Sequence, residues 1–301
     1  MSSFTDALAA GPIVLDGGLG TLLESHGHDL SSSLWSARLL LDDPDAIRRA
    51  HAEYFTAGAR VAITSSYQVS FTVLDAAGLT RGEVGALLAR SVEMGRRARD
   101  DAGLSADEAW VAASVGPYGA SRADGSEYTG DYDLDTAGLR AWHRPRLEAL
   151  AAAGPDAIAV ETIPSLAELE AVCRELDGLG IPTWVSMTIA DGMLRSGESL
   201  SEAFALAEAV PDVVAVGVNC CDAAEVGGAL AARAGGVPGV VYPNSGEVWH
   251  ADARRWSGET SPIAPRAGEW IEDGARLVGG CCRVGPDQIT QIARTVASLR
   301  A

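Results

Sequence analysis

Eight short apolar runs, separated by longer amphipathic segments, divide the chain from end to end. They are PIVLD (12–16), RVAITSS (60–66), WVAASVG (110–116), AIAVET (157–162), TWVSMTI (183–189), VVAVGVNC (213–220), GVVYPNS (239–245) and RLVGGCC (276–282). The runs are rich in β-branched residues and almost continuously apolar, as strands must be when both faces are buried. Eight strand–helix repeats in 301 residues predict one α/β domain, a (β/α)8 TIM barrel that spans residues 1–301.

The intervening segments have the patterns of helices. Ser165 and Glu168 form a capping box that begins one helix. A last helix begins near Pro286, and residues 81–101 and 136–153 have similar patterns. The apolar positions expected to share a face are Leu166, Leu169, Cys173 and Leu176 in the first helix and Ile289, Ile292, Ala293, Val296 and Leu299 in the last.

A doubly wound open sheet is the main alternative fold. That fold often carries a G-x-G-x-x-G phosphate loop after its first strand. DGGLGT (16–21) follows the first apolar run, but its glycines do not have that spacing. Residues 119–134 form the one long polar stretch, which we predict to be an active-site loop or lid, since long loops in compact domains are often functional.

Charge and cysteine content exclude several classes of protein. The chain has 23 basic and 41 acidic residues, a net charge of −18, which argues against binding to nucleic acid or to an anionic membrane. The N-terminal segment has no signal-peptide pattern, and no run approaches the ~18 apolar residues of a membrane span. An odd count of five cysteines without an export signal predicts free thiols in a reducing cytoplasm.

Polar and sulfur-containing residues gather where the predicted strands end. In a barrel of this kind the active site lies at the C-terminal ends of the strands. The sequence therefore predicts a site in that position, built from several strand ends. The residues there are Asp16, Ser65 to Gln68, Gly116-Pro117, Glu161-Thr162, Asp191, Asn219-Cys220, Asn244-Ser245 and Cys281-Cys282.

Four of the five cysteines end the sixth and eighth predicted strands. The fifth, Cys173, lies on a helical apolar stripe and is expected to be a core residue. Cys281 and Cys282 can share a target only if the chain turns there, which Gly279 and Gly280 permit. Three thiolates that converge, with a fourth position open, are typical of catalytic zinc. Four buried thiols without a metal are the alternative.

Seven motifs together resemble the homocysteine S-methyltransferase family. They occur in the family's order from residue 16 to residue 283, and the likeness is greatest to the short, single-domain branch that uses S-methylmethionine or S-adenosylmethionine. The motifs are LDGGLGT, GPYGA with DGSEYTGDY, HRPR, ETIPS, GVNC, YPNSGE and GGCCR. The resemblance implies a zinc barrel whose ligands are Cys220, Cys281 and Cys282, with Cys221 a bystander.

The resemblance also implies how the amino acid substrate is bound. It assigns the substrate ammonium group to Asp16 and Glu161. The backbone N–H groups of Gly17 and Gly18 are expected to bind the substrate carboxylate, because a run of oriented amides forms an anion nest. We expect Asn219 to orient a ligand or the substrate.

Three further residues have weaker signals. Tyr67 and Gln68 are expected to line the donor side of the site, and His143 to be structural. The motifs SSYQVS and SMTIADGMLRSGESL depart from the family pattern in this same region, so the sequence leaves the identity of the donor open.

The expected reaction is methyl transfer from a sulfonium donor to the zinc-bound thiolate of homocysteine, giving methionine. A related thiol or selenol acceptor, such as selenocysteine, is one alternative, and a non-catalytic metal-storing or thiol-sensing barrel is another. An aldolase- or lyase-type barrel would need a Schiff-base lysine, and none of the eight strand ends carries one. The oligomeric state is left open.

Overall fold

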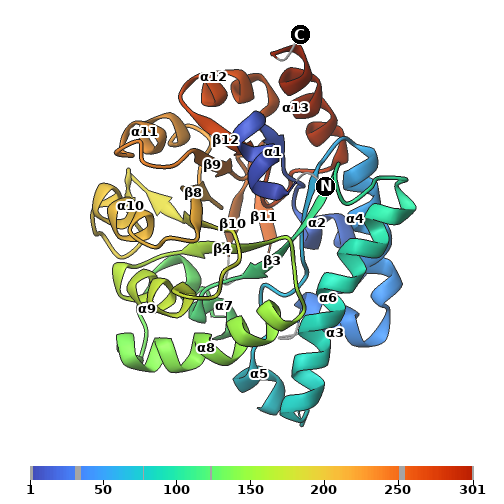
Figure 1. The fold of residues 1–301 in the computed structure, drawn as a ribbon, viewed down its shortest axis with the longest axis vertical. Coiled ribbons are helices and arrows are strands. Elements are labelled where there is room, and N and C mark those ends of the chain that lie inside the picture. The colour runs from blue at the N-terminus through green and yellow to red at the C-terminus, as the bar shows by residue number, and fades with distance from the viewer. Residues whose placement is uncertain (1–2, 31–34, 77, 123, 251–254, 300–301) are drawn as a thin grey trace.

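Eight parallel strands form one sheet that curves into a barrel (Figure 1). The computed structural model describes residues 3–30, 35–76, 78–122, 124–250 and 255–299. The order around the sheet is β1-β12-β9-β8-β5-β4-β3-β2, and a parallel bridge between Leu15 and Val61 joins its two ends. The predicted barrel is therefore confirmed. The strands are β1 (Ile13–Val14), β2 (Val61–Ile63), β3 (Trp110–Val115), β4 (Ala157–Ile163), β5 (Thr183–Met187), β8 (Val213–Asn219), β9 (Gly239–Tyr242) and β12 (Ala275–Val278).

Helices surround the barrel, and two short hairpins extend from it. The hairpins are β6 (Ile189–Ala190) with β7 (Met193–Leu194), and β10 (Val248–His250) with β11 (Arg255–Ser257). The helices are α1 (Phe4–Ala10), α2 (Leu19–Ser25), α3 (Trp35–Asp42), α4 (Pro44–Thr56), α5 (Phe71–Ala76), α6 (Arg81–Asp101), α7 (Tyr118–Arg122), α8 (Thr136–Ala152), α9 (Leu166–Leu176), α10 (Leu200–Glu208), α11 (Val226–Ala231), α12 (Ala267–Glu272) and α13 (Pro286–Ser298), with 3₁₀ turns η1 (Ser126–Tyr128) and η2 (Ala264–Arg266).

The four predicted helices are present, but three details of the sequence analysis are wrong. Leu299 is 48% exposed, because α13 ends one residue before it. The Ser165 hydroxyl does accept from the Glu168 N–H, but the Glu168 carboxylate is bound to other groups and does not complete the capping box. The polar stretch 119–134 is not one open loop, since it contains most of α7 and all of η1.

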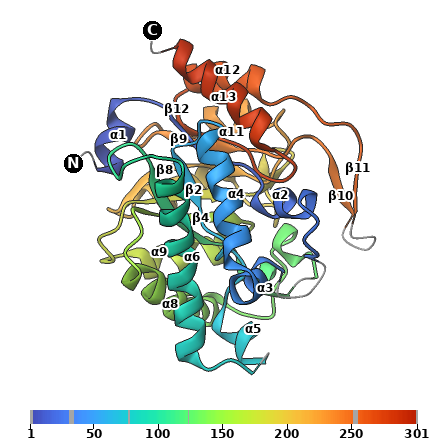
Figure 2. The same ribbon diagram turned by 90° about the vertical axis from the view of Figure 1, so that its right-hand side faces the viewer.

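Alternate residues of each strand separate two apolar cores. Val14, Val111, Ile158 and their equivalents face the helices, whereas Leu15 and Ala159 face the barrel interior. Helix α1 packs Phe4 and Leu8 into the interior cluster. Figure 2 shows α1 and the β10–β11 hairpin at opposite ends of the molecule, so α1 covers the amino-terminal end of the barrel.

The barrel interior becomes polar toward the carboxyl ends of the strands. Below this level the interior holds apolar side chains such as Trp184 and Leu277. Closer to those ends, side-chain hydrogen bonds join β3 to β4 and join β5 to both β8 and β9, as buried polar groups require. The members of this polar layer are Ser114, Glu161, Ser186, Asn219 and Tyr242.

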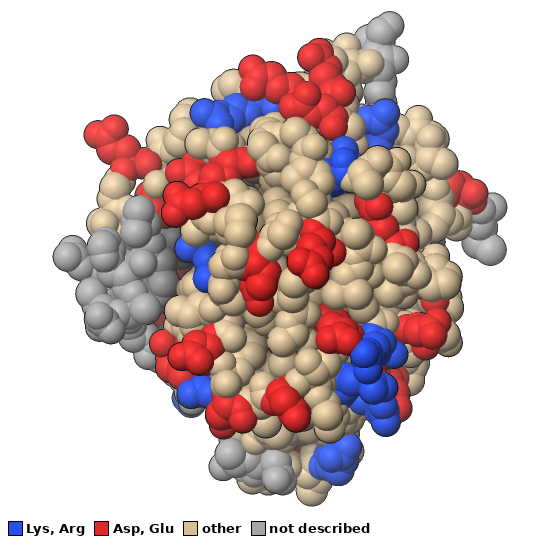
Figure 3. Space-filling model, turned by 90° about the vertical axis from the view of Figure 1, so that its left-hand side faces the viewer, with Lys and Arg blue, Asp and Glu red and all other residues tan. Residues whose placement is uncertain are grey.

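Two surface properties bear on partners. On the face shown in Figure 3, acidic and basic side chains of the described residues are interspersed, and no broad basic area is visible. Among the helices of the described chain, none is both long enough and apolar enough to cross a bilayer.

Close packing between β8 and β9 predicts the effect of an added methyl group. A Cβ at Gly217 would clash with the Val240 carbonyl oxygen, whereas one at Gly228 in α11 would meet nothing within 4 Å. We expect Gly217→Ala to lower the free energy of unfolding by roughly 1–3 kcal/mol. Gly228→Ala should raise it, by up to about 1 kcal/mol. Urea denaturation of both variants checks this, and an unchanged midpoint in Gly217→Ala would contradict the tight packing.

Candidate metal centre

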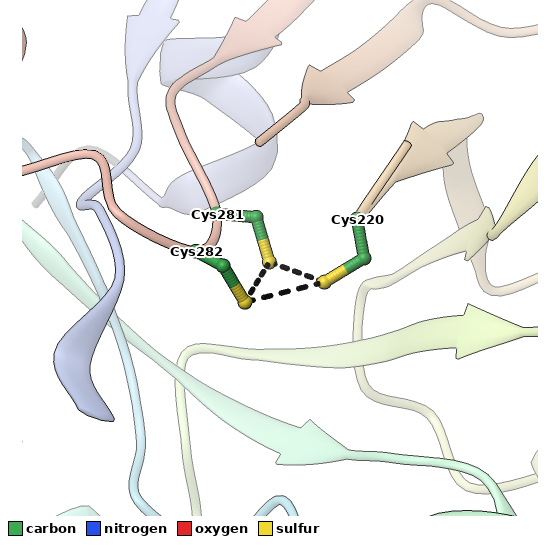
Figure 4. A group of neighbouring side chains, drawn as sticks. All are labelled: Cys220, Cys281 and Cys282. Atoms are coloured by element: carbon green, nitrogen blue, oxygen red, sulfur yellow. Dashed lines mark hydrogen bonds between the residues drawn. The ribbon is translucent and has the colours of Figure 1, made fainter. Parts of the chain in front are cut away.

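Three cysteine side chains from two strand ends converge on one point. Cys220 follows β8, and Cys281 and Cys282 lie in the turn after β12, with their sulfurs directed toward one another (Figure 4). The Sγ–Sγ distances are 2.6 Å for Cys220–Cys281, 3.9 Å for Cys220–Cys282 and 4.0 Å for Cys281–Cys282. The structure thus brings together the three residues that the sequence analysis selected.

This donor set fits a tetrahedral metal ion that prefers sulfur. With Zn–S bonds of 2.3 Å, two ligands of one zinc lie about 3.8 Å apart. Two of the three distances agree with that value, and Cys220 and Cys281 would have to move apart to share the ion. Three protein ligands leave the fourth position open, as in catalytic sites.

Without a cation the cluster holds its protons. For each cysteine, a hydrogen bond with one neighbouring thiol lowers the pKa and a bond with the other raises it. Burial and the nearby Glu161 also raise it, so the pKa of Cys220, Cys281 and Cys282 lies well above the usual value for a thiol. A divalent ion that binds thiolates would therefore release these protons on binding.

The loops after β9 and β12 hold each other in place. Cys281 N–H donates to the Pro243 carbonyl at 2.8 Å, and Cys282 N–H donates to Asn244 Oδ1 at 3.1 Å. The Ser245 N–H donates back to the Cys282 carbonyl at 3.2 Å. The YPNSGE motif therefore positions the GGCCR motif, and Asn244 acts on the cluster by orienting Cys282.

Cys220 has a backbone conformation that is strained for a residue other than glycine. This residue has φ of 50°, and Thr162 near the end of β4 has φ of 63°, a conformation that is unusual for a β-branched residue. The Asn219 side chain fixes Thr162, because Oδ1 accepts from the Thr162 N–H at 2.7 Å and Nδ2 donates to Oγ1 at 2.7 Å. Ser186 Oγ donates to the same Oδ1 at 2.8 Å. Asn219 is thus fully buried and engaged with protein groups, so of the two expected roles these contacts favour orienting the adjacent Cys220 over orienting the substrate.

The remaining two cysteines lie away from the cluster. Cys221 packs into the apolar core between barrel and helices, and so does Cys173. Burial raises the pKa of Cys173 to about 12 and also raises that of Cys221. The structure therefore favours Cys220 over Cys221 as the member of the pair that faces the site.

Two buried carboxyl groups lie near the cluster in the barrel mouth. Asp16 Oδ2 accepts from the Ile63 N–H at 2.9 Å, and His51 Nδ1 is 3.8 Å away, but Oδ1 has no partner among the described residues. Glu161 accepts a hydrogen bond from Ser114 Oγ. Burial raises the pKa of Asp16, and burial with the nearby Asp16 charge raises the pKa of Glu161 to about 7. Such a pair is suited to a cationic group.

The two glycines after Asp16 are needed for close approach. A Cβ at Gly17 would clash with the Val284 carbonyl oxygen, and one at Gly18 with the Cys281 carbonyl oxygen. The Gly18 N–H donates to Val284 O at 3.0 Å. The expectation that this amide is free to bind a carboxylate is therefore wrong for Gly18.

Arg146 anchors the predicted donor side. This buried arginine donates to the carbonyl oxygens of Gly116 at 2.9 Å, Ser66 at 3.3 Å and Tyr67 at 2.7 Å. Gln68 Nε2 donates to the Ala120 carbonyl at 3.1 Å, while its Oε1 has no partner among the described residues. Arg146 is the last residue of the HRPR motif, but its role was not predicted, because nothing in a single sequence shows that a helical arginine is buried.

His143 is structural, as expected. It lies in the middle of α8 rather than at a helix start, and its Nε2 is 2.8 Å from Glu168 Oε1. The same oxygen accepts from the Tyr118 N–H at 2.6 Å. Burial lowers the pKa of His143, against the opposing effect of Glu168, so the pair joins α8, α9 and α7 with the imidazole neutral.

In the polar stretch 119–134, Tyr128 approaches the cluster and was missed, as was the adjacent Glu127. Tyr128 is half-buried, and burial with the nearby Cys220 and Cys282 raises its pKa well above the usual value. Burial raises the pKa of the adjacent Glu127 to about 7, and its Oε2 has no partner among the described residues. Both residues belong to the DGSEYTGDY motif of the predicted active-site loop, but the motif alone assigned neither of them a role.

The chain is similar to known proteins over most of its length. A family model described as homocysteine S-methyltransferase matches residues 13–296. Homocysteine S-methyltransferase 4 of Zea mays is 44% identical over 308 residues, which cover 96% of this chain and 90% of the relative. The homocysteine S-methyltransferase of Escherichia coli (strain K12) is 42% identical over 290 residues, covering 93% and 94%. The metallated form of the homocysteine methyltransferase MmuM from Escherichia coli has a TM-score of 0.83 at 39% identity and covers 94% of this chain and 96% of that one. The resemblance drawn from the motifs is confirmed.

The raised pKa of Glu161 predicts a dependence of stability on pH. Between pH 4.5 and about 7 the unfolded chain ionises this carboxyl while the folded protein keeps it protonated, so stability falls as pH rises. The loss amounts to about 3 kcal/mol. In chelator-treated protein, Glu161→Gln should therefore gain stability over wild type as pH rises through this window.

The exposed Glu93→Gln variant is the matched control and should differ from wild type by the same small amount at every pH. Urea midpoints at pH 4.5 to 8 measure both differences. A Glu161→Gln difference that does not change with pH would mean that this carboxyl is ionised normally.

Proposed function

The chain belongs to the homocysteine S-methyltransferase family, and we propose that it uses zinc to transfer a methyl group from a sulfonium donor to homocysteine. The observation that carries this proposal is the cluster of Cys220, Cys281 and Cys282 at the mouth of the barrel. All of residues 1–301 would serve one homocysteine-binding domain. Five free thiols favour a reducing compartment, which we take to be the cytoplasm.

The cysteine cluster would supply three zinc ligands and leave one position for the substrate sulfur. A zinc ion bound there would act as a Lewis acid that keeps the homocysteine thiol deprotonated at neutral pH. The chain's own part is to hold the three sulfurs in place, through the strained backbone at Cys220 and through the hydrogen bonds that the Cys281 and Cys282 N–H groups donate to Pro243 and Asn244.

Asp16 and Glu161 would hold the ammonium group of homocysteine. The unpartnered Asp16 Oδ1 and the neighbouring Glu161 offer acceptors in a water-poor environment, where a charge-assisted hydrogen bond is strong. An incoming ammonium group would favour ionisation of both acids and so offset the cost of burying them. This arrangement fixes the acceptor at both ends, its sulfur and its amino group.

The transfer step needs positioning more than it needs a protein base. The homocysteine sulfur forms a bond to the donor methyl carbon while the methyl–sulfonium bond breaks, and that electron pair stays on the departing sulfur. One proton leaves the homocysteine thiol. With S-methylmethionine both products are methionine, and with S-adenosylmethionine they are methionine and S-adenosylhomocysteine. Holding the reacting atoms in line supplies much of the rate. The chain contains no lysine, which excludes an imine-forming alternative.

Two adjacent cysteines provide a sharp test of the ligand set. Cys220 faces the cluster whereas Cys221 packs into the outer core. We expect Cys220→Ser to lose bound zinc and to lower methionine formation by at least about a hundredfold, since removing a ligand removes the activated sulfur. Cys221→Ser should retain one zinc per chain and most of the activity.

Zinc is measured by elemental analysis of freshly reduced protein, and methionine by chromatography with S-methylmethionine, S-adenosylmethionine or betaine as donor. Zinc loss in Cys221→Ser but not in Cys220→Ser would overturn the assignment. Full zinc with no methionine from any donor would overturn the proposed reaction while leaving the metal site intact.

A further inference from the structure

The chain after β5 carries an arginine into the barrel mouth. Hairpin β6–β7 turns through Asp191 and Gly192, whose φ angles of 53° and 73° suit a two-residue hairpin turn. The Gly192 N–H donates to Glu225 Oε2 at 2.9 Å, which ties the turn to the segment after β8. Arg195 follows β7 directly, so its position is set by ordered structure.

Arg195 lies beside the cysteine cluster. Its Nε donates to Thr188 Oγ1 at 3.4 Å, and that hydroxyl donates to the Cys220 carbonyl at 3.3 Å. Its guanidinium carbon lies 5.7 Å from the centre of the Tyr128 ring. Two independent neighbours, Thr188 and Tyr128, thus place the guanidinium at the edge of the site.

The charge of Arg195 is not neutralised within the described part of the chain. Arg283, on the other side of the mouth, forms a two-pronged ion pair with Glu247. Arg195 has no carboxylate partner among the described residues, although the chain carries a net charge of −18. A half-buried guanidinium whose terminal nitrogens are available is suited to bind a carboxylate in a bidentate manner.

We propose that Arg195 binds the carboxylate of the methyl donor, a sulfonium amino acid, and so selects donors that carry this group. The proposal rests on the proposed function. Both S-methylmethionine and S-adenosylmethionine carry an α-carboxylate. Because either donor also carries a sulfonium charge, a cation at this place is tolerable only if the donor presents its carboxylate to it.

Sheet topology favours the donor over homocysteine as the source of this carboxylate. In the ring of eight strands β5 lies opposite β1, so Arg195 and Asp16 approach the mouth from opposite sides. The ammonium and carboxylate of one amino acid share a carbon and lie within about 3.5 Å of each other. If Asp16 and Glu161 hold the homocysteine ammonium, the homocysteine carboxylate stays on their side, and Arg195 is left for the second substrate.

The test compares two donors that differ in one group. S-methylmethionine is set beside (3-aminopropyl)dimethylsulfonium, which is the same molecule without its carboxylate. For S-methylmethionine, Arg195→Gln should raise the donor KM about tenfold to one-hundredfold, the range expected for lost hydrogen bonds between charged groups. For the decarboxylated donor the same variant should leave KM unchanged or lower it, because a repulsive charge is removed. Arg195→Lys keeps the positive charge but loses the planar guanidinium, so its KM for S-methylmethionine should lie between the values of wild type and Arg195→Gln.

Three further measurements exclude indirect effects. The homocysteine KM and the zinc content should be unchanged in Arg195→Gln. Arg294→Gln, on the exposed face of α13, makes the same charge change far from the site and should match wild type with both donors. If S-methylmethionine is not used, S-adenosylmethionine and its decarboxylated form replace the pair.

Each outcome has a defined meaning. An equal rise in KM for both donors would overturn the proposal in favour of a general electrostatic role at the cysteine cluster. A rise in the homocysteine KM alone would assign Arg195 to the acceptor instead. Wild-type protein that transfers no methyl group from any sulfonium would overturn the proposed function and this inference with it, whereas an active wild type with an unaltered Arg195→Gln would overturn the inference alone.

Discussion

Contact between the first and last strands of the barrel, β1 and β12, is the interaction on which the site depends. The loops after β1 and β12 hold each other through two main-chain hydrogen bonds, Gly18 N–H to Val284 O and Gly280 N–H to Asp16 O. Both positions require glycine. A Cβ at Gly18 would clash with the Cys281 carbonyl oxygen in the opposite loop, and a Cβ at Gly280 would clash with Val284 in the same turn. This contact fixes two of the candidate metal ligands relative to the carboxyl group that we assign to the substrate. Reactions that depend on alignment need such fixed distances.

A layer of hydrogen-bonded side chains, which includes Glu161, Asn219 and Tyr242, lies between the cysteine cluster and the apolar interior of the barrel. Asn219 illustrates the principle, since its amide holds Thr162 in a strained conformation while its own backbone leads directly into Cys220. Strain of this kind persists only where the surroundings determine it fully. A fully satisfied network also gives the strand ends one arrangement rather than several.

The ionisable groups buried at the barrel mouth lower the stability of the folded protein, and the proposed function explains why they are there. Asp16 and Glu161 are buried, and their raised pKa values show that the folded protein bears a cost for keeping them there. The three clustered thiols add to this cost, because their raised pKa values oppose the ionisation that a bound cation would require. The proposed function gives each of these groups an opposite charge to bind, an ammonium group for the acids and a metal ion for the thiols. Arg195, with the reverse sign on the facing side, completes a site in which two substrates are distinguished by charge.

The sequence by itself indicated the barrel and a group of cysteines at its strand ends, because buried parallel strands must be apolar throughout and their carboxyl ends must meet on one face. The choice of Cys220, Cys281 and Cys282 within that group came from the resemblance of the motifs to a known family. Local patterns also set the limits of α6 and the start of α13. Only the tertiary structure decided which groups are free and which are engaged. Gly18 and Asn219 have the right chemistry for substrate, yet their partners are Val284 and Thr162, which lie far away in sequence. The sequence does not distinguish the roles of Arg146 and Arg195. In the structure, Arg146 is buried and donates to main-chain carbonyl groups, whereas Arg195 lies at the open mouth of the barrel. Hydrogen-bond partners and burial arise from long-range packing, which no spacing of residues along one chain records.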